Sequence, residues 1–305
     1  MSRHALRAGL VLLVAMGLAG CGKSTTAPVA PPTDQSQVDA LLTQGYGLVD
    51  DGITGSAEAQ GFSFQAGDPN GTFAAIHPLY FWRTLTSETF SWTISFSDTD
   101  ASGHPTTALA LVPRHLLGDL NLVHSIPGDS TVADTANVVH KPLDDHWVRH
   151  VRFKRVPIPT LGETRWRFAG TSLVEVTSDV NTTRIQSVHV QTSTLDTTLT
   201  DPAALFRLRD VLRIGPSDSV RVTVTTNHPD DVVLLHHADH RRPFRNNGDG
   251  TYSIRWVTGP LGGWRHFGVD AIAHATLFDD AAGYDSNRWV IPFVVTSQTP
   301  VDYYP

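Results

Sequence analysis

The chain has a single cysteine, Cys21, among its 305 residues. One thiol has no partner for an intramolecular disulfide, and it excludes haem attachment through Cys-x-x-Cys-His. Hydrophobic residues make up 40% of the chain. The folded part is therefore large and apolar enough to be stable without a disulfide.

The sequence also lacks the local motifs that mark common catalytic sites. It contains no Gly-x-Ser-x-Gly, Ser-x-x-Lys or His-Glu-x-x-His motif, and no Gly-x-Gly-x-x-Gly or Walker-type loop. Catalytic residues that meet only in space leave no such motif. The sequence therefore favours a non-catalytic protein and leaves an enzyme open as an alternative.

A block of basic residues is absent as well. The formal net charge is −7, and removal of residues 1–20, which hold two arginines and no acidic residue, makes it −9. A chain this acidic is not expected to bind nucleic acid or anionic lipid surfaces.

The first 21 residues have a distinct organisation. Arg3 and Arg7 precede a short apolar run, Leu10–Leu18. The run is followed directly by Ala19-Gly20-Cys21. Positive charge, an apolar stretch and small residues in this order are typical of a secretion signal. The segment resembles the signal peptide and lipobox of bacterial lipoproteins. The resemblance implies cleavage between Gly20 and Cys21 and a covalent lipid on Cys21 as the anchor.

Three other interpretations of this segment fit its residues less well. A transmembrane helix needs about 20 apolar residues, more than Leu10–Leu18 supplies. A plain secretory signal does not require a cysteine after the small residues, and a buried helix is poorly compatible with the prolines that follow. Gly22 in place of aspartate after the cysteine implies, by the same resemblance, delivery to the outer membrane of a bacterial envelope.

Residues 21–35 are rich in serine, threonine, alanine and proline and predict a disordered tether behind the lipid. Ser36 and Asp39 then form a capping-like start for a short helix that uses Val38, Leu41 and Leu42.

Beyond this helix the pattern predicts an all-β, mainly antiparallel fold. Apolar and polar residues alternate over Phe90–Ser97, and Thr106–Val112 follows as the return strand of a hairpin. The chain from Asp201 either begins a helix or leads into a strand from Phe206 to Ile214. Gly215-Pro216 is the expected domain boundary, so residues 36–215 are expected to form a β-rich domain of uncertain topology.

Residues 216–305 show short strands at spacings typical of a β-sandwich. The last two begin near Phe267, with an apolar face reaching Leu277, and at Trp289. Asp249-Gly250-Thr251-Tyr252 resembles the turn of filamin-type and bacterial immunoglobulin-like repeats. This resemblance implies an immunoglobulin-like sandwich, with Tyr252 placed like the tyrosine of the corner motif. It implies fold and no chemistry.

Two clusters of residues were considered as metal ligands. The densest is His236, His237, Asp239 and His240, because zinc takes three or four histidine, cysteine or carboxylate ligands. Arg241 and Arg242 follow directly, and their charge opposes a dication. A polar loop at the end of the sandwich is therefore the favoured interpretation of this cluster.

The second cluster is Asp144, Asp145, His146 and His150. On a helix, histidines four residues apart lie close together. On the strand that alternation predicts, four residues span about 13 Å, so a solvated strand face is favoured. The turn at Asn247–Gly250 lacks the acidic residues of an EF-hand calcium loop.

The sequence thus predicts a lipid-anchored envelope protein that serves as a non-catalytic binding or scaffold module. Its expected partners are the membrane, through the lipid, and another envelope protein or an extracellular ligand, with no nucleic acid and no cofactor besides the lipid. A metal-dependent binder or hydrolase using clustered histidine and aspartate is one alternative. A structural spacer is the other.

Overall fold

The computed structural model describes residues 33–45, 60–61, 76–125, 138–158, 163–237 and 240–297. The chain divides into two units, Met1–Thr33 and Asp34–Pro305. The elements below belong to the second unit. Gly20, Cys21 and the rest of the predicted leader and tether lie outside the described residues.

The predicted short helix is confirmed as α1, Asp34–Gln44. It starts two residues earlier than Ser36, and Val38 and Leu42 are its buried residues. Two tryptophans hold the helix to the strands, because Trp166 Nε1 donates to Asp34 Oδ1 at 2.9 Å and Trp92 Nε1 donates to Asp39 Oδ1 at 2.8 Å.

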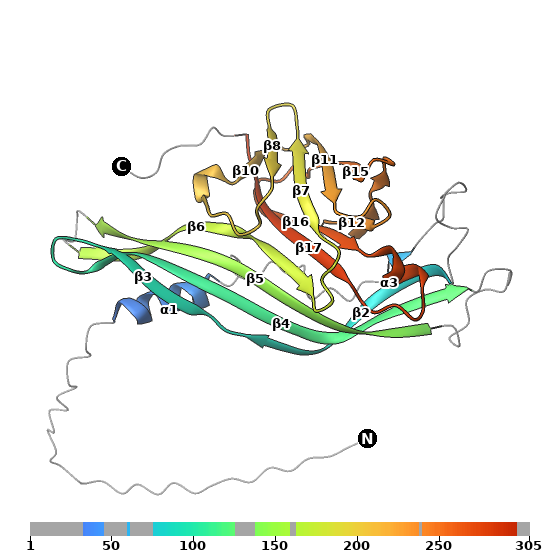
Figure 1. The fold of residues 1–305 in the computed structure, drawn as a ribbon. Helices are drawn as coiled ribbons and strands as arrows, with labels where there is room; N and C mark the ends of the chain where they lie inside the picture. Colours follow the sequence, from blue (N-terminus) through green and yellow to red (C-terminus); the bar gives the residue numbers. More distant parts are fainter. Residues whose placement is uncertain are drawn as a thin grey trace, which may run out of the picture. The chain divides into compact units, whose positions relative to one another are not determined.

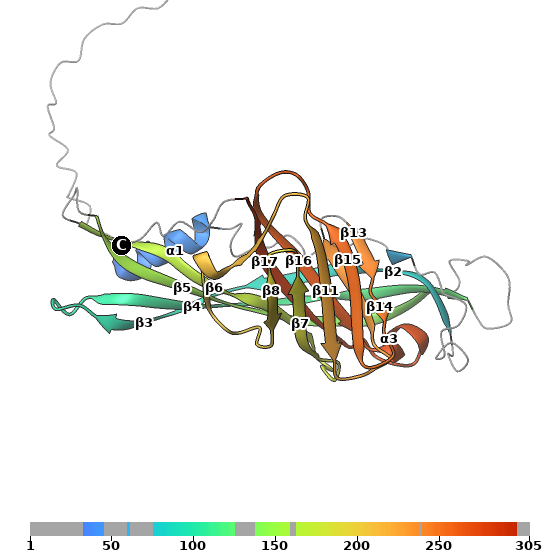
Figure 2. The same ribbon diagram turned by 90° about the horizontal axis from the view of Figure 1, so that it is seen from above.

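Most of the remaining chain is antiparallel β-structure in two sheets, as the alternation predicts (Figures 1 and 2). Sheet A has long strands that curl. Its strands in spatial order are β1 (Gln60–Gly61), β2 (His77–Phe90), β4 (Pro105–Ser125), β5 (Val138–Ile158), β6 (Glu163–Ser178), β17 (Ser286–Val295), β16 (Gly263–Ile272), β12 (Val232–His237) and β13 (His240–Pro243). Three further strands join it at β4, β6 and β17, namely β3 (Thr93–Thr99), β9 (Phe206–Arg207) and β10 (Leu212–Ile214).

Sheet B is smaller and covers only part of sheet A (Figure 2). Its order is β14 (Arg245–Asn246), β15 (Thr251–Val257), β11 (Ser219–Thr226), β7 (Ile185–Gln191) and β8 (Asp196–Leu199). Its inward residues, such as Val190, Val222 and Ile254, share one core with Ile291 and Phe293 of β17. We call this side of sheet A the sandwich face.

The opposite side of sheet A, the reverse face, has its own core. Trp147 and Val176 pack there with Val38 and Leu42 of α1. β6 and β17 therefore contribute buried apolar residues to both faces, for example Leu173 and Ile291 to the sandwich face and Val176 and Val290 to the reverse face.

Strands on both sides of Gly215-Pro216 pair with one another. β7 lies beside β11 in sheet B, and β6 lies beside β17 in sheet A. Of the two alternatives for the segment from Asp201, the helix is wrong, because no helix begins there among the described residues. The strand from Phe206 to Ile214 is present in two short pieces, β9 and β10, with a 3-10 turn at Leu208–Asp210 between them.

Two expected strand boundaries are wrong. The strand predicted over Phe90–Ser97 is divided, since β2 ends at Phe90 and β3 begins at Thr93. The apolar face predicted from Phe267 to Leu277 ends at Ile272, and a helix, α3 (His274–Phe278), follows. The alternation beyond Ile272 depends on alanine, which has little preference for strands. Leu277 is still buried, but it belongs to α3.

Tyr252 also departs from the corner motif. Its hydroxyl donates to the carbonyl of His228 at 3.2 Å, 24 residues upstream and in the loop between β11 and β12. The hydroxyl of a corner tyrosine bonds to backbone only a few residues upstream. The ring itself is buried, at 1% exposure.

The loop between β11 and β12 also contains Asp231, whose carboxyl group has a raised pKa. Burial raises the pKa of Asp231 to about 6, with Thr183 Oγ1 at 3.4 Å from Oδ1. A raised pKa favours the protonated carboxyl in the folded state. The contribution of the protonated Asp231 to stability is complete at pH values below the pKa of this group in the unfolded chain. It is lost as the pH rises through about 6.

We therefore expect Asp231→Asn to gain stability relative to the wild type as pH rises from about 4 to about 7, by about 2 kcal/mol. Urea unfolding of both proteins across this range measures the difference. The exposed neighbour Asp230 provides the control variant Asp230→Asn. A difference that does not change with pH would contradict the prediction.

Candidate metal centre

The first predicted ligand cluster is not brought together among the described side chains. His236 and His237 are consecutive on β12, so they point to opposite faces of the sheet. His236 is buried at 2% exposure. His237 lies over the sandwich core, with its ring 5.9 Å from Trp256, and burial lowers its pKa. Asp239 and the side chain of His240 lie outside the described residues.

The second predicted cluster divides in the same way along β5. Asp144 and His146 share one face of the strand, whereas Asp145 lies on the reverse face beside Arg83, at 3.8 Å. Burial raises the pKa of Asp145. His150 is four residues from His146 on the strand, too far to share an ion with it.

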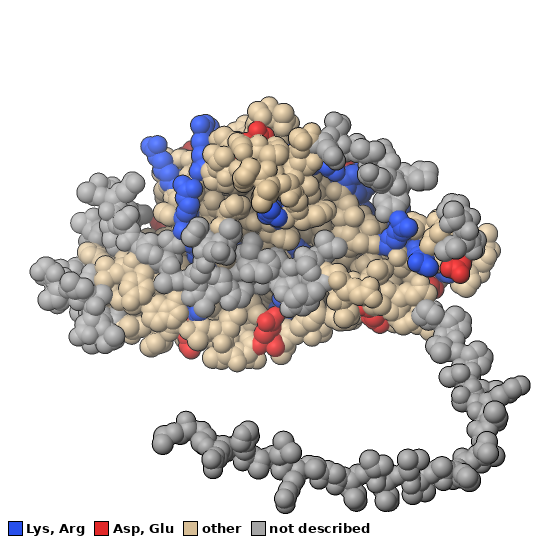
Figure 3. Space-filling view, turned by 180° about the vertical axis from the view of Figure 1, so that it is seen from behind, with Lys and Arg blue, Asp and Glu red and all other residues tan. Residues whose placement is uncertain are grey.

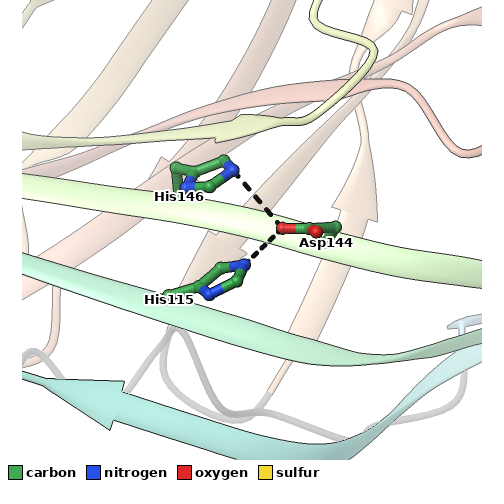
Figure 4. A group of neighbouring side chains, drawn as sticks. All are labelled: His115, Asp144 and His146. Atoms are coloured by element: carbon green, nitrogen blue, oxygen red, sulfur yellow. Dashed lines mark hydrogen bonds and ion pairs between the residues drawn. The ribbon is translucent and has the colours of Figure 1, made fainter.

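A histidine from the neighbouring strand completes the group that the sequence did not assemble. His115 of β4 lies directly opposite His146 of β5 in the antiparallel register. Together with Asp144 the two histidines face one another on the sandwich face of β4 and β5 (Figure 4).

The three side chains are in direct contact. His115 Nε2 is 2.6 Å from Asp144 Oδ1, and His146 Nε2 is 3.3 Å from the same oxygen. The imidazole rings are stacked, with centroids 4.7 Å apart and planes 5° apart. Each residue offers one ligand atom, and these atoms lie within 4.8 Å of one another.

This geometry suits a first-row transition metal. Zinc binds histidine nitrogen and carboxylate oxygen at about 2.0–2.2 Å, so ligand atoms around it lie about 3.3 Å apart. Two of the contacts between the groups, at 2.6 Å and 3.3 Å, are close to this spacing. Imidazole nitrogens favour zinc, copper or nickel over magnesium or calcium, which prefer all-oxygen sites.

The group is open to solvent. The side chains of His115, Asp144 and His146 are 37%, 39% and 49% exposed. Asp179 lies beside it, because its backbone N–H donates to the carbonyl of Asp144 at 3.0 Å and its side chain is exposed. Three protein ligands leave at least one position for a further ligand.

Sequence reasoning missed His115 because it is 29 residues from Asp144. The available signal was its place in β4, where it interrupts a row of apolar residues that includes Leu111 and Leu117 on the same face. Only the pairing register of β4 and β5 identifies His146 as its neighbour.

Comparisons with known proteins give no family for this chain. No family model matches it, and neither curated proteins nor solved structures provide a match. Within the described part of the chain, no helix has the length and hydropathy needed to span a membrane.

Proposed function

We propose that this protein is a lipid-anchored binding module of a bacterial cell envelope that holds a divalent transition metal ion through His115, Asp144 and His146. The convergence of three ligand atoms within 4.8 Å on a solvent-open strand pair is the observation that carries this proposal. It favours the metal-dependent binder over a spacer, with two ligands from the second cluster, Asp144 and His146, and a third, His115, that the sequence did not indicate.

We propose further that the two stacked sheets form an immunoglobulin-like sandwich over about residues 185–295. Support comes from the strand order. β7, β11, β15 and β14 are arranged as strands A, B, E and D, and β13, β12, β16 and β17 as C′, C, F and G. In this assignment strand A is β7, so the sandwich begins before Gly215-Pro216, and β2–β6 extend its second sheet to carry the metal ligands.

Metal titration of the full-length protein in a non-ionic detergent tests the metal site. Isothermal titration with Zn²⁺ is expected to show one tight site per chain, and His115→Ala is expected to weaken it at least about 100-fold, because a first-sphere ligand outweighs the outer-shell partners whose loss costs 10- to 100-fold. Zn²⁺ at about 100 times its dissociation constant is expected to stabilise the wild type by about 2.7 kcal/mol.

The controls use neighbouring residues. The chain has 15 histidines, so His150→Ala, on the same face of β5, must retain the affinity of the wild type. Asp179→Asn tests the exposed carboxylate next to the site, with about tenfold weaker binding if it supplies a fourth ligand. Equal losses in His115→Ala and His150→Ala would rule out the assigned ligands.

The envelope location rests on the leader alone. Intact-mass analysis of membrane-extracted protein is expected to show loss of residues 1–20 and an acylated Cys21. A mass that retains the leader would remove the anchor from the proposal and leave the metal site as it stands.

A further inference from the structure

The outward face of sheet B is the second surface with unusual chemistry. Because Val220, Val222 and Val224 of β11 point into the sandwich, the alternate residues of each strand point away from it. The residues that share this outward face are Ser187, His189 and Gln191 of β7, Asp196 and Thr198 of β8, Ser219, Arg221, Thr223 and Thr225 of β11, Arg245 of β14, and Thr251, Ser253, Arg255 and Val257 of β15.

Two arginines on this face stand directly opposite one another. Arg221 of β11 pairs in register with Arg255 of β15, and both side chains are exposed. Like charges in this arrangement are destabilising. Among the described residues, no carboxylate lies within the 4.0 Å of an ion pair to either arginine or to Arg245.

The nearest acidic residue on the face is already engaged. Asp196, on the far strand β8, accepts hydrogen bonds from His189 Nε2 at 2.7 Å and Gln191 Nε2 at 2.9 Å. Positive charge thus gathers toward β15 on a chain whose net charge is −7. Figure 3 shows the molecule from behind, with several lysine or arginine side chains (blue) on its upper part, where sheet B lies.

We propose that this arginine face, defined by Arg221, Arg245 and Arg255, binds an anionic polysaccharide through its sulfate or carboxylate groups. Guanidinium groups form paired hydrogen bonds with such anions. Thr223 and Ser253 form the next pair along this face after Arg221 and Arg255, with Arg245 opposite Ser253, and they offer hydroxyls to sugar hydroxyl groups. Side chains on one strand face repeat about every 6.6 Å, which suits an extended polymer lying along the sheet.

The same face is less suited to other partners. Its described residues include no phenylalanine, tyrosine or tryptophan for stacking neutral sugars, so charge has to supply the affinity. Val257 is its one large exposed apolar side chain, at 62% exposure, which is too little for insertion into a lipid surface.

The test measures binding of fluorescein-labelled dextran sulfate to the full-length protein in non-ionic detergent, with EDTA present so that the metal site is not involved. The wild type is expected to bind dextran sulfate and not neutral dextran, with affinity that falls as salt is added. The double variant Arg221→Ser/Arg255→Ser is expected to bind at least about tenfold more weakly.

The matched control is Arg165→Ser/Arg207→Ser, which removes two exposed arginines from sheet A and changes the net charge equally. It is expected to keep the affinity of the wild type, and circular dichroism checks that both variants fold. Equal weakening in the two double variants, no binding by the wild type, or binding to phosphatidylglycerol vesicles in place of dextran sulfate would each overturn the proposal. None of these results bears on Zn²⁺ binding.

Discussion

Asp270→Ala is expected to lower the free energy of unfolding by about 3–5 kcal/mol, because it breaks a buried ion-pair network. Asp270 of β16 is 1% exposed and lies opposite Arg288 of β17, whose Nε donates to its Oδ1. Arg241 Nε lies 3.7 Å from the other carboxylate oxygen. Both guanidiniums are almost completely buried, so loss of the carboxylate leaves Arg288 charged in the core without its ion-pair partner.

Thermal and urea unfolding of the wild type and Asp270→Ala measure this loss, with an expected fall in Tm of about 10 °C. Asp270→Asn keeps the shape and removes only the charge, so it is expected to lose most of the same stability. Replacement of Asp270, Arg288 and Arg241 together by leucine, methionine and leucine is expected to recover much of it, since apolar groups often substitute for a buried ion network. A loss below about 1 kcal/mol in Asp270→Ala would show that the network contributes little.

Trp147→Ala is the second variant with a large expected effect, a loss of about 3–5 kcal/mol. Trp147 is fully buried on the reverse face of β5, packed with Val112, Val151 and Val176. Its ring also faces two cations, with the guanidinium carbons of Arg114 and Arg149 at 4.8 Å and 5.7 Å from the ring centroid. Truncation leaves a large cavity and removes both cation–π contacts.

Urea unfolding of Trp147→Ala against Trp264→Ala tests this prediction. Trp264 is 42% exposed, so its truncation is expected to cost less than about 1 kcal/mol. Although Trp147 is adjacent to His146 in sequence, the two side chains point to opposite faces of β5. Folded Trp147→Ala is therefore expected to keep the Zn²⁺ affinity of the wild type, and a large loss of affinity would contradict this separation of the faces.

The buried tryptophans show where sequence reasoning about the fold succeeded. Trp147, Trp166, Trp256 and Trp289 each fall on the apolar side of an alternating strand, and each is at most 6% exposed. Trp264, which follows two glycines in the sequence, is 42% exposed. Alternation is a property of the strand backbone itself, so it is visible without knowledge of the partner strand.

Buried charge was invisible to the same reasoning. Arg83, Arg149 and Arg288 are at most 3% exposed, although arginine is a residue type that is mostly exposed in folded proteins. Two of them have ion-pair partners on other strands, Asp145 for Arg83 and Asp270 for Arg288. No local pattern distinguishes such an arginine from an exposed one.

The sequence by itself determined the β-rich class, the helix near residue 36 and the turn at Asn246–Gly250, because each depends on neighbours within a few residues. The tertiary structure alone decided that β7 joins β11 across Gly215-Pro216, that Asp144 and His146 meet His115, and that Arg221 stands against Arg255. The physical reason is register. A shift of one residue between two strands would turn every one of these side chains to the other face, and that alignment is fixed by packing of the whole sheet rather than by any short stretch of chain.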